Sequence, residues 1–474
     1  MKREFLIYRF LFCVSMLLGS VVSFSQTPYN VVMNFTQDPT TQMAFNWFTA
    51  ANSSCGQVMV IGGGITKIVS ATCSQYSGAT INKATVTGLT PNTTYSFQIG
   101  SVNGTFKTAP NNNLPFSFIY VADTQIDYFL MGKPLSEYSV FPMLQMNAQV
   151  LCADNQDTRF CLHGGDMVWE GRVWDGQKWE LDFDSDIKQW YRFFASQPDL
   201  FLKLPFAPVM GNHDKIFNNF KPHFNVNSAP FDTDGSTYTF IYGNTQFFAI
   251  NSEKDITYIN NLKKWMQDSV RAHPNITWRV VYCHTGIYSS YNTDSYLWSN
   301  NIAPLFDTLG IDIVFQGHTH IYDVIGPVRN KNYVQASVIN VTKADTQYPE
   351  NISGKLGGVF NVQKGTLYIT NGTLGNTGTL VPKSLTSTPP LPSHYLPLMT
   401  GRWGQLYNSY SNVSVTSDKI IITTYEIVNG NSQMFDEITI VKRPCLPSVE
   451  NPVSQTISSN TVWSIPQSIS NNIV

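Results

Sequence analysis

The chain has 474 residues, of which 42% are hydrophobic and only 13% are charged, and its formal net charge at pH 7 is −2. This length exceeds one ordinary hydrophobic core, so two or three domains are expected. The near-neutral charge, without a Lys/Arg run, excludes an electrostatic groove for nucleic acid and a patch for anionic membranes. Few charges together with 13% aromatic residues favour a β-rich extracellular protein.

Residues 1–26 have the pattern of a secretory signal peptide. Lys2 and Arg3 give a positive start, an apolar run covers 10–22, and small residues precede a cut near Gln26. A membrane anchor is the alternative, but the run is short for a bilayer, which needs about 20 apolar residues. The sequence therefore predicts a secreted, periplasmic or extracellular protein with no integral membrane segment after signal removal.

Residues 27–109 contain short apolar stretches separated by turn residues, which is the spacing of a small β-sandwich. Trp47 is the candidate core tryptophan, and residues 89–95 resemble the tyrosine-corner turn of fibronectin type III domains. No catalytic constellation lies here, so a packing or spacing module is predicted. The expected strands are 31–35, 43–48, 57–61, 84–87 and 94–100.

The cysteines allow more than one interpretation. Cys55 and Cys73 fall in the first domain and could pair in an oxidising compartment. Cys152 and Cys161 could pair as well, and buried free thiols are an equally good interpretation of both pairs. Cys283 precedes a candidate metal ligand, but on a buried strand it is expected to be a small core residue.

Residues 110–113 indicate a linker, and after them buried strands alternate with amphipathic helices, as in an α/β domain. This domain is predicted over 114–442, with a β-rich final part that completes its sheets. A Ser-, Asn- and Pro-rich tail or linker follows at 443–474. The expected strands are 116–121, 160–163, 207–210, 238–241, 246–250, 278–282, 311–315, 365–370 and 419–427, and the expected helices are 141–153, 187–195, 258–271 and 303–309.

Polar clusters directly follow five of these strands. Because sites in open α/β sheets form at the carboxyl ends of strands, the clusters are expected to converge. Carboxylates, a carboxamide and imidazoles suit Zn, Mn or Fe, and a shared carboxylate can bridge two ions about 3.5–4 Å apart for in-line phosphoryl transfer. Each cluster alone is weak evidence, whereas the ordered set is strong. The clusters contain Asp123, Gln125, Asp166, Asn212, His213, Asp214, His284, His318 and His320.

The order of these clusters resembles that of the calcineurin-like metallophosphoesterase superfamily. From about residue 30 to 440 the chain is most similar to the purple acid phosphatase branch, which has a fibronectin type III-like N-terminal domain, and the similarity includes 235–252, 278–291 and 304–322. The resemblance implies two mixed β-sheets flanked by helices, two metal ions (Fe, Zn or Mn) and a phosphorylated small-molecule substrate.

The resemblance also implies a role for each clustered residue. A metal-bound hydroxide would attack phosphorus in line. His213 would contact the phosphate and protonate the leaving alkoxide, and Asp214 is a candidate for orienting His213. The implied metal ligands are Asp123, His320 and, as a fourth ligand, Gln125 at one ion, Asn212, His284 and His318 at the other, and Asp166 as the bridge.

Two positions depart from the family pattern. Purple acid phosphatases carry an iron-ligating tyrosine three residues after the bridging aspartate, and Trp169 at that position cannot ligate, which argues against a purple ferric centre. Gln125 stands where many members have histidine, and Tyr128 is a more distant substitute. The further histidine of the branch has no counterpart in 292–298, so Asn251 and Tyr288 are candidates for the rim.

Three functions remain open from the sequence. A phosphomonoesterase is the first, and a phosphodiesterase or nucleotide hydrolase using the same site is the second. The third is a non-catalytic surface binding module, which the retention of one bridging carboxylate and three imidazoles disfavours. The remaining histidines are expected to be structural: His163, His223, His273 and His394.

Overall fold

The computed structural model describes residues 27–126, 158–174, 178–289, 296–334, 338–342, 357–372, 374–375, 408–428 and 431–442. Residues 1–442 form one compact unit, and residues 443–474 form another. The predicted signal peptide, the tail and the helix expected over 141–153 lie outside the described residues. Among the helices that are described, none has the length and apolar character needed to cross a membrane.

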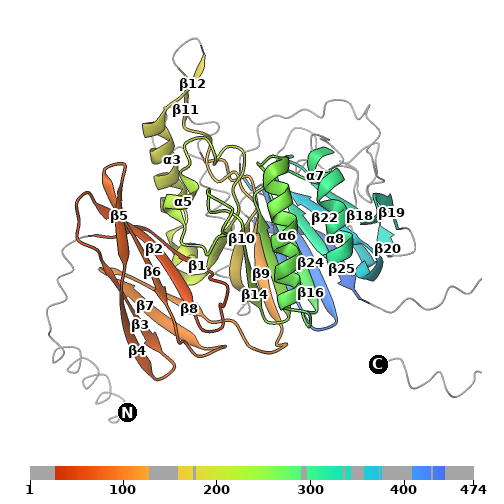
Figure 1. Cartoon of the computed structure of the whole chain (residues 1–474), viewed down its shortest axis with the longest axis horizontal. Coiled ribbons are helices and arrows are strands. Elements are labelled where there is room, and N and C mark those ends of the chain that lie inside the picture. The colour runs from red at the N-terminus through yellow and green to blue at the C-terminus, as the bar shows by residue number, and fades with distance from the viewer. Residues whose placement is uncertain are drawn as a thin grey trace, which may run out of the picture. The chain divides into compact units, whose positions relative to one another are not determined.

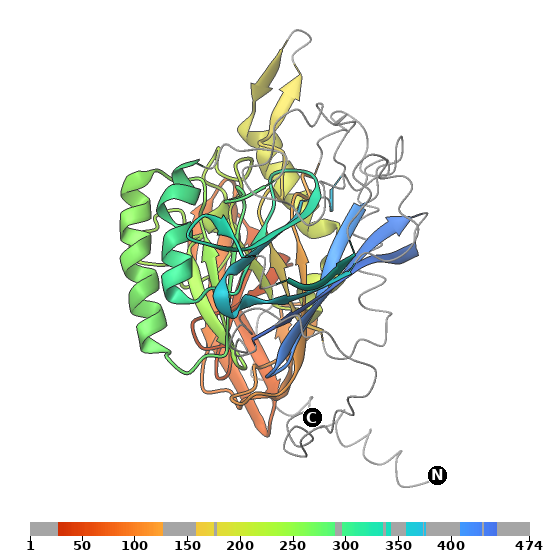
Figure 2. The same ribbon diagram turned by 90° about the vertical axis from the view of Figure 1, so that its right-hand side faces the viewer.

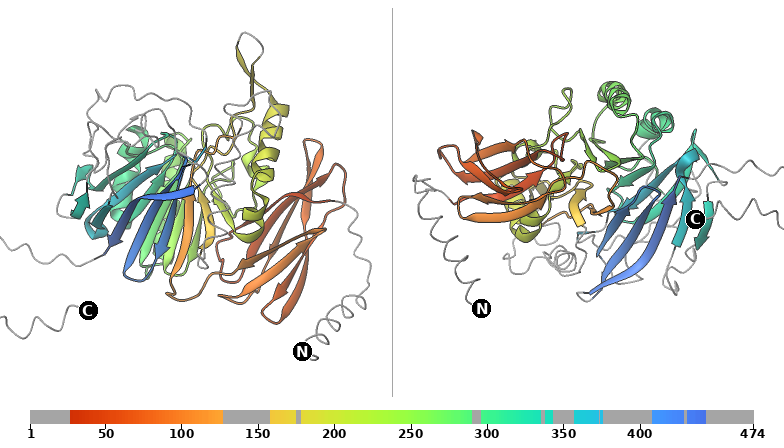
Figure 3. Two further views of the ribbon diagram at one scale, coloured as in Figure 1. Left: turned by 180° about the vertical axis from the view of Figure 1, so that it is seen from behind. Right: turned by 90° about the horizontal axis from the view of Figure 1, so that it is seen from below.

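The N-terminal part is a sandwich of two antiparallel four-stranded sheets (Figure 3). Trp47 is 1% exposed in its core, and the hydroxyl of Tyr95 accepts the Thr90 N–H at 2.8 Å, which is the expected tyrosine-corner contact. Cys55 and Cys73 form a disulfide. One sheet contains β1 (Tyr29–Asn34), β2 (Met43–Ala50), β6 (Ala79–Val86) and β5 (Thr72–Tyr76), and the other β4 (Ile65–Ser70), β3 (Gln57–Gly62), β7 (Thr94–Ile99) and β8 (Val102–Lys107).

The α/β part is built on two larger mixed sheets, as predicted. The eight-stranded sheet contains, in spatial order, β13 (Phe206–Pro208), β10 (Thr158–His163), β9 (Phe116–Val121), β23 (Asn408–Val415), β24 (Lys419–Val428), β25 (Asn431–Val441), β21 (Gly357–Asn361) and β20 (Val338–Thr342). The seven-stranded sheet contains β14 (Tyr238–Tyr242), β15 (Thr245–Ile250), β16 (Trp278–Cys283), β17 (Ile313–Gln316), β22 (Thr366–Asn371), β18 (Tyr322–Arg329) and β19 (Asn332–Tyr333).

Aromatic side chains fill the space between the two large sheets. Strand β9 shows the principle, because successive side chains of a strand point to opposite faces. Phe116, Phe118 and Tyr120 face the inner core, whereas Ile119 and Val121 pack on the other side. The ring of Phe118 stacks on Phe160 of β10 at a centroid distance of 5.1 Å and meets Phe247 of β15 edge-on at 5.3 Å.

Helices cover the outer faces of both sheets (Figure 1). On the seven-stranded sheet, α6 (Ile256–Ala272) and α8 (Ala303–Leu309) bury Ile259 and Phe306 in one cluster with strand residues. On the eight-stranded sheet, α3 (Phe183–Ala195) and α4 (Pro198–Lys203) bury apolar side chains in a second hydrophobic cluster with strand residues of that sheet. The remaining helical segments are α5 (Phe220–His223), α7 (Tyr296–Asn301) and the 3-10 turn Val362–Lys364.

A short hairpin of β11 (Arg172–Trp174) and β12 (Trp179–Leu181) projects beyond α3, at the top of Figure 2. The sequence missed this hairpin. It also missed several strands of the two large sheets, among them β18, β23 and β25, whereas the elements that it did predict, including β22 and β24 in the C-terminal part, lie within a few residues of those observed. The considered Cys152–Cys161 pair is not formed, since Cys161 is a buried free thiol on β10. Cys283 is likewise free and buried, as expected.

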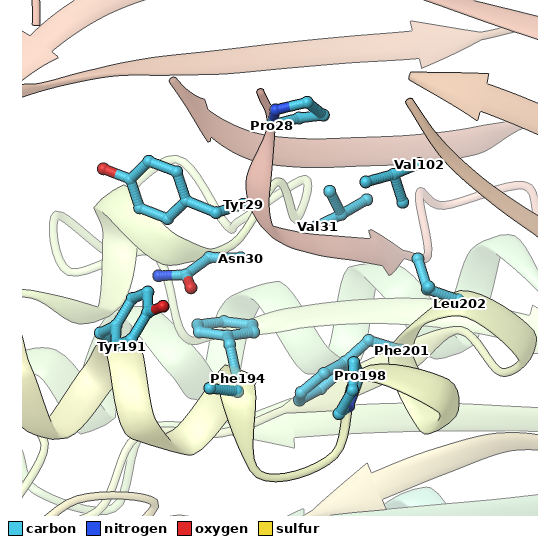
Figure 4. Close-up of a pocket in the computed structure, with 11 residues that line it drawn as sticks. Pro28, Tyr29, Asn30, Val31, Val102, Tyr191, Phe194, Pro198, Phe201 and Leu202 are labelled. Carbon is cyan, nitrogen blue, oxygen red and sulfur yellow. The ribbon is translucent and has the colours of Figure 1, made fainter. Parts of the chain in front are cut away.

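Polar and aromatic contacts join the sandwich to the α/β part. Asn34 donates its side-chain N–H to the Phe206 carbonyl at 2.8 Å and accepts the Asn225 backbone N–H at 2.8 Å. The His223 ring stacks between Phe48 of the sandwich and Trp190 of α3, at centroid distances of 5.0 and 4.5 Å. An apolar pocket of about 200 Å³ lies beside these contacts, between β1, β8, α3 and α4 (Figure 4).

Candidate metal centre

The predicted site residues follow the carboxyl ends of strands in both large sheets. Strands β9, β10 and β13 are mutually parallel in one sheet, and β15, β16 and β17 are parallel in the other. The residues after these strands turn sharply: Asp123, Asp166 and His318 all have left-handed backbone conformations, with φ of 57°, 55° and 70°. Such conformations cost energy in non-glycine residues and cluster at functional sites.

The clusters converge around Asp166. Its Oδ2 lies 3.1 Å from Nε2 of His284. The same His284 nitrogen lies 3.0 Å from Oδ1 of Asn212, which in turn lies 2.9 Å from Nδ1 of His318. Ligand atoms of Asp123, Asp166 and His284 all lie within 4.8 Å of one another. These contacts bring residues from the ends of five strands to one place.

The second half of the site is built on Asp123. Its Oδ1 lies 3.3 Å from Nε2 of His320, and its two carboxylate oxygens accept the His318 backbone N–H at 3.1 and 2.9 Å. The other ring nitrogen of His320, Nδ1, is buried and makes no hydrogen bond among the described residues. His320 therefore points its Nε2 at Asp123, and its role as a ligand stays a prediction.

These spacings fit metal ions. Nitrogen and oxygen ligands lie about 2.0–2.2 Å from zinc and comparable ions, so neighbouring ligands at right angles are about 3 Å apart. The donor atoms around Asp166 and Asn212 are separated by 2.9–3.1 Å. The donor set of two carboxylates, a carboxamide oxygen and imidazoles also suits borderline ions. The residues present therefore fit the metal centre that the fold implies.

A neighbouring carbonyl fixes the ring of His284. Its Nδ1–H donates to the Gly164 carbonyl at 2.9 Å, which leaves Nε2 to face Asp166 and Asn212. Metal-binding histidines commonly donate their second ring N–H to a carbonyl in this way, which sets the tautomer and ring orientation. The backbone carbonyl that follows β10 thus leaves Nε2 of His284 free to face Asp166 and Asn212.

The site carries an excess of negative charge. Burial by itself lowers the pKa of His284, but the carboxylates of Asp166 and Asp123 outweigh it and raise that pKa to about 10. Burial raises the pKa of Asp166, yet His284 and His213 hold it well below its usual value. The raised pKa means that the buried carboxylates favour the positively charged form of the imidazole. A bound cation would compensate the same negative charge.

Gln125 lies in the site as well. Its side-chain N–H donates to Oδ2 of Asp166 at 3.1 Å, and its backbone φ is 42°. The carboxamide is therefore in direct contact with the carboxylate of Asp166. Its role as a fourth ligand stays a prediction, and Tyr128 lies outside the described residues.

Asp214 has a different role from the one suggested for it. Its carboxylate accepts four backbone N–H groups, from Asp166 and Gly211 at 2.8 and 2.9 Å and from Met167 and Val168 at 2.9 and 3.2 Å. A carboxylate occupied in this way holds the Asp166 turn against the Gly211 turn. The carboxylate that contacts the ring of His213 belongs to another residue.

That residue is Glu170, which the sequence did not reveal. Oε1 of Glu170 lies 2.7 Å from Nδ1 of His213, and the ring of Trp169 stacks on the imidazole at a centroid distance of 4.1 Å. Nε2 of His213 lies 3.7 Å from Oδ2 of Asp166. Trp169 thus occupies the family's tyrosine position as a stacking partner of His213. The signal available was the Asp-x-x-Trp-Glu spacing, which has no common motif behind it.

Glycines at the site are required for space. A Cβ on Gly211 would lie 2.1 Å from Oδ1 of Asp166, and one on Gly317 would lie 2.5 Å from Oδ2 of Asp123. Neither glycine has a positive φ, and the neighbouring left-handed residues are Asp166 and His318. The carboxylates approach the glycine backbone so closely that no side chain fits.

The other candidates lie around or away from the centre. His163 is buried behind it, where it contacts Thr124 and accepts the Gly165 N–H, and burial lowers its pKa to about 3. Tyr288 packs edge-on against Tyr368 at 4.9 Å. Asn251 is buried and donates to Asp234 at 3.4 Å. Rim roles for Asn251 and Tyr288 stay predictions, and His394 lies outside the described residues.

Comparisons with known proteins agree with this geometry. Residues 117–322, which contain every predicted metal ligand, match the calcineurin-like phosphoesterase family, and residues 28–118 match the purple acid phosphatase N-terminal domain. The solved structure of purple acid phosphatase PPD1 from yellow lupin (Lupinus luteus) seeds superposes with a TM-score of 0.61 at 14% identity, covering 88% of this chain and 75% of that one. This likeness shows the fold.

Curated relatives are distant. An uncharacterized protein of Mycobacterium tuberculosis is 23% identical over 347 residues, which are 63% of this chain and 62% of that protein. A purple acid phosphatase of Glycine max is 24% identical over 357 residues, or 69% and 66% of the two chains. This chain thus matches a little under two thirds of the length of these relatives. The chain therefore contains a calcineurin-like phosphoesterase domain at 117–322, preceded at 28–118 by a purple acid phosphatase N-terminal domain.

Proposed function

We propose that this protein is a secreted phosphoesterase with two metal ions that hydrolyses phosphate monoesters. The observation that carries the proposal is the ring of donor atoms around Asp166, where carboxylate, carboxamide and imidazole groups lie 2.9–3.1 Å apart at the ends of strands from two sheets. Uncompensated buried charge is costly, so a buried group of carboxylates with carboxamide and imidazole neighbours is suited to binding cations.

The proposed ligand assignment is the one that the family resemblance implies, and the contacts around Asp166 and Asp123 support it. Asp166 would serve both ions, with Asp123 and His320 at one, Gln125 as its fourth ligand, and Asn212, His284 and His318 at the other. The ions would be Fe, Zn or Mn, and Trp169 in place of a ligating tyrosine disfavours a purple ferric centre. Two such ions activate water and polarise a phosphoryl group.

The side chains of the protein supply the remaining functions. His213 would contact the phosphate and give a proton to the departing alcohol oxygen, because its Nε2 faces Asp166 at 3.7 Å. Asp214 and His163 hold the loops that carry the ligands. Asn212 and His318 face each other at 2.9 Å, which keeps the carboxamide oxygen directed into the site.

Secretion is supported by the basic and apolar start of the chain and by the Cys55–Cys73 disulfide, since disulfides persist in oxidising compartments.

The α/β part, and not the N-terminal sandwich, would carry the chemistry, because the predicted ligands all lie within 123–320.

The test compares 4-nitrophenyl phosphate with bis(4-nitrophenyl) phosphate, using protein loaded in turn with zinc, manganese and iron. We expect hydrolysis that depends on added metal and favours the monoester at least tenfold. A preference for the diester would replace the monoesterase by a phosphodiesterase using the same site. Absence of metal-dependent hydrolysis of either substrate would leave a binding module.

A further inference from the structure

Glu253, which follows strand β15, contacts two segments that carry predicted ligands. Its Oε1 accepts the hydroxyl of Thr285, the residue directly after His284. Its Oε2 lies 3.0 Å from Nζ of Lys215, which stands three residues after Asn212. The side chain of Glu253 is 8% exposed and that of Lys215 is 41% exposed. A largely buried carboxylate therefore lies beside the metal centre, with its cationic partner on the surface.

The scaffold fixes the place of this carboxylate. The hydroxyl of Ser252 accepts the backbone N–H groups of His284 and Thr285 at 3.2 and 2.7 Å. The side-chain oxygen of Asn251 accepts the Glu253 backbone N–H at 3.1 Å. Three consecutive residues at the end of β15 thus bind to one another and to the segment of His284, so Glu253 is held next to that segment.

The two halves of the predicted site differ in charge. One half has a carboxylate of its own, Asp123. In the other, which we call the neutral half, the predicted ligands are a carboxamide and two imidazoles, and Oδ1 of Asn212 lies 3.0 and 2.9 Å from ring nitrogens of His284 and His318. Only the shared carboxylate of Asp166 approaches these groups directly. A further negative charge nearby would therefore favour a cation in the neutral half.

The charge of Glu253 reaches both imidazoles of the neutral half. Burial lowers the pKa of His284, whereas nearby carboxylates raise it, Asp166 first and Glu253 among them. Burial and then the charge of His284 lower the pKa of His318, and Glu253 is again one of the carboxylates that oppose this change. A carboxylate that favours positive charge on two rings also favours a cation bound by them.

We propose that Glu253 is an outer carboxylate that strengthens cation binding in the neutral half, and that Lys215 limits this effect by pairing with it. The inference rests on the proposed two-metal function and adds to it the groups that set the affinity for one ion. Unlike charges attract and like charges repel, so the two side chains should have opposite effects. If the pair only tied two segments together, removal of either side chain would weaken binding.

The experiment is a calorimetric titration of the metal-free mature chain with zinc, for the wild type and for Glu253→Gln, Lys215→Met and Thr285→Val. Glutamine has the shape of glutamate and keeps one oxygen for the hydroxyl of Thr285, so Glu253→Gln removes the charge alone. The matched controls are Glu180→Gln and Lys178→Met, the same two changes in an exposed ion pair of the β11–β12 hairpin, where the charged atoms are 2.8 Å apart.

We expect Glu253→Gln to weaken one of two zinc ions about tenfold to a hundredfold, the range for changes just outside the ligands of a metal, and the other less than about threefold. Lys215→Met should tighten the first ion by up to about fivefold, the limit for an exposed pair. Thr285→Val should change it less than about threefold, because the charge of Glu253 stays. Both control variants should bind zinc as the wild type does.

A second pair of titrations assigns the effect to one half of the site. In a His318→Ala background, which weakens the neutral half, Glu253→Gln should change the affinity for the remaining ion less than about threefold, because residues that act on one site are not additive. In an Asp123→Asn background, which weakens the opposite half, Glu253→Gln should still cost at least about tenfold.

Weaker zinc binding in Lys215→Met would show a mechanical tie and overturn the proposal, and this variant changes an exposed side chain, so it reports the sign even where Glu253→Gln is unstable. Unchanged binding in Glu253→Gln, or equal losses at both ions, would also overturn it. The titrations use no substrate, so a chain that binds two zinc ions as expected but hydrolyses no ester would contradict the proposed function alone. A wild-type chain that binds fewer than one ion would contradict both.

Discussion

The carboxylate of Asp214 accepts the backbone N–H of Asp166 at 2.8 Å, and the same oxygen accepts the Gly211 N–H at 2.9 Å. One buried side chain therefore ties the turn of Asp166 to the turn that carries Asn212. Asp214→Asn would replace an accepting oxygen by an N–H group that faces backbone donors. We expect a loss of about 1–3 kcal/mol in the free energy of unfolding, the cost of an unsatisfied buried donor, together with weaker metal binding.

Urea unfolding checks the first effect, and metal retention after dialysis against a weak chelator checks the second. The matched control is Asp312→Asn, which removes a buried carboxylate that accepts the Arg279 N–H at 2.8 Å away from the centre. The control should lose stability and keep its metal. Full metal retention in Asp214→Asn would contradict the positioning role.

Gly211→Ala should remove the metal centre with little change elsewhere. The new Cβ would lie 2.1 Å from Oδ1 of Asp166, closer than nonbonded atoms approach, so the Asp166 carboxylate must move. Productive sites tolerate displacements of only about 0.5 Å. Calorimetric titration with zinc should show at least a tenfold weaker affinity. Gly357→Ala is the control, because its Cβ meets nothing nearer than 3.6 Å, and an equal effect there would refute the steric explanation.

Acid should destabilise the folded chain through His223, which stacks between Phe48 and Trp190. Burial lowers its pKa to about 3, with Lys83 as a smaller cause, while the unfolded value is near 6.5. Between these pH values the unfolded chain binds one more proton, so the free energy of unfolding falls as pH decreases from about 6.5 to 3. Above about 6.5 this contribution to stability is fully present.

His223→Phe should flatten that part of the stability–pH curve, since a phenyl ring can stack without titrating. It also loses the hydrogen bond from Nδ1–H to the Asn219 carbonyl, about 1 kcal/mol at every pH. Lys83 is charged in both states throughout this window, because its pKa, lowered first by burial, stands at about 8. Chemical unfolding at pH 4, 5, 6 and 7 measures the slope, and an unchanged slope in the variant would assign the acid sensitivity to other groups.

The sequence predicted the parts of the site that depend on strand order. Asp166, Asn212 and His284 each follow a buried strand, and parallel strands place their carboxyl ends at one edge, so the convergence could be read from apolar runs and the polar residues after them. The tyrosine-corner contact between Thr90 and Tyr95 was accessible for a different reason, because its two residues are only five positions apart in the chain.

What the sequence missed depends on contacts between distant segments. Glu170 reaches His213 across 43 positions, and nothing in its neighbours marks it as a partner of an imidazole. Asp214 follows His213 directly, which suggested a local pair, yet its carboxylate turns to the Asp166 loop, because three backbone N–H groups of that loop and the Gly211 N–H gather around it. Side-chain direction after a tight turn is set by tertiary packing.

The central claim is tested most directly by counting metal ions per chain in the purified mature protein and in Asp166→Asn, beside the hydrolysis of 4-nitrophenyl phosphate. Asp166 is the residue whose contacts join both halves of the site, so its loss should reduce occupancy at both. We expect close to two ions per wild-type chain and fewer than one in Asp166→Asn. The activity of the variant should fall at least about a hundredfold, because the metal ions supply the activated water and the charge that stabilises the transition state. Fewer than one ion in the wild-type chain, with equal activity in both forms, would contradict the account.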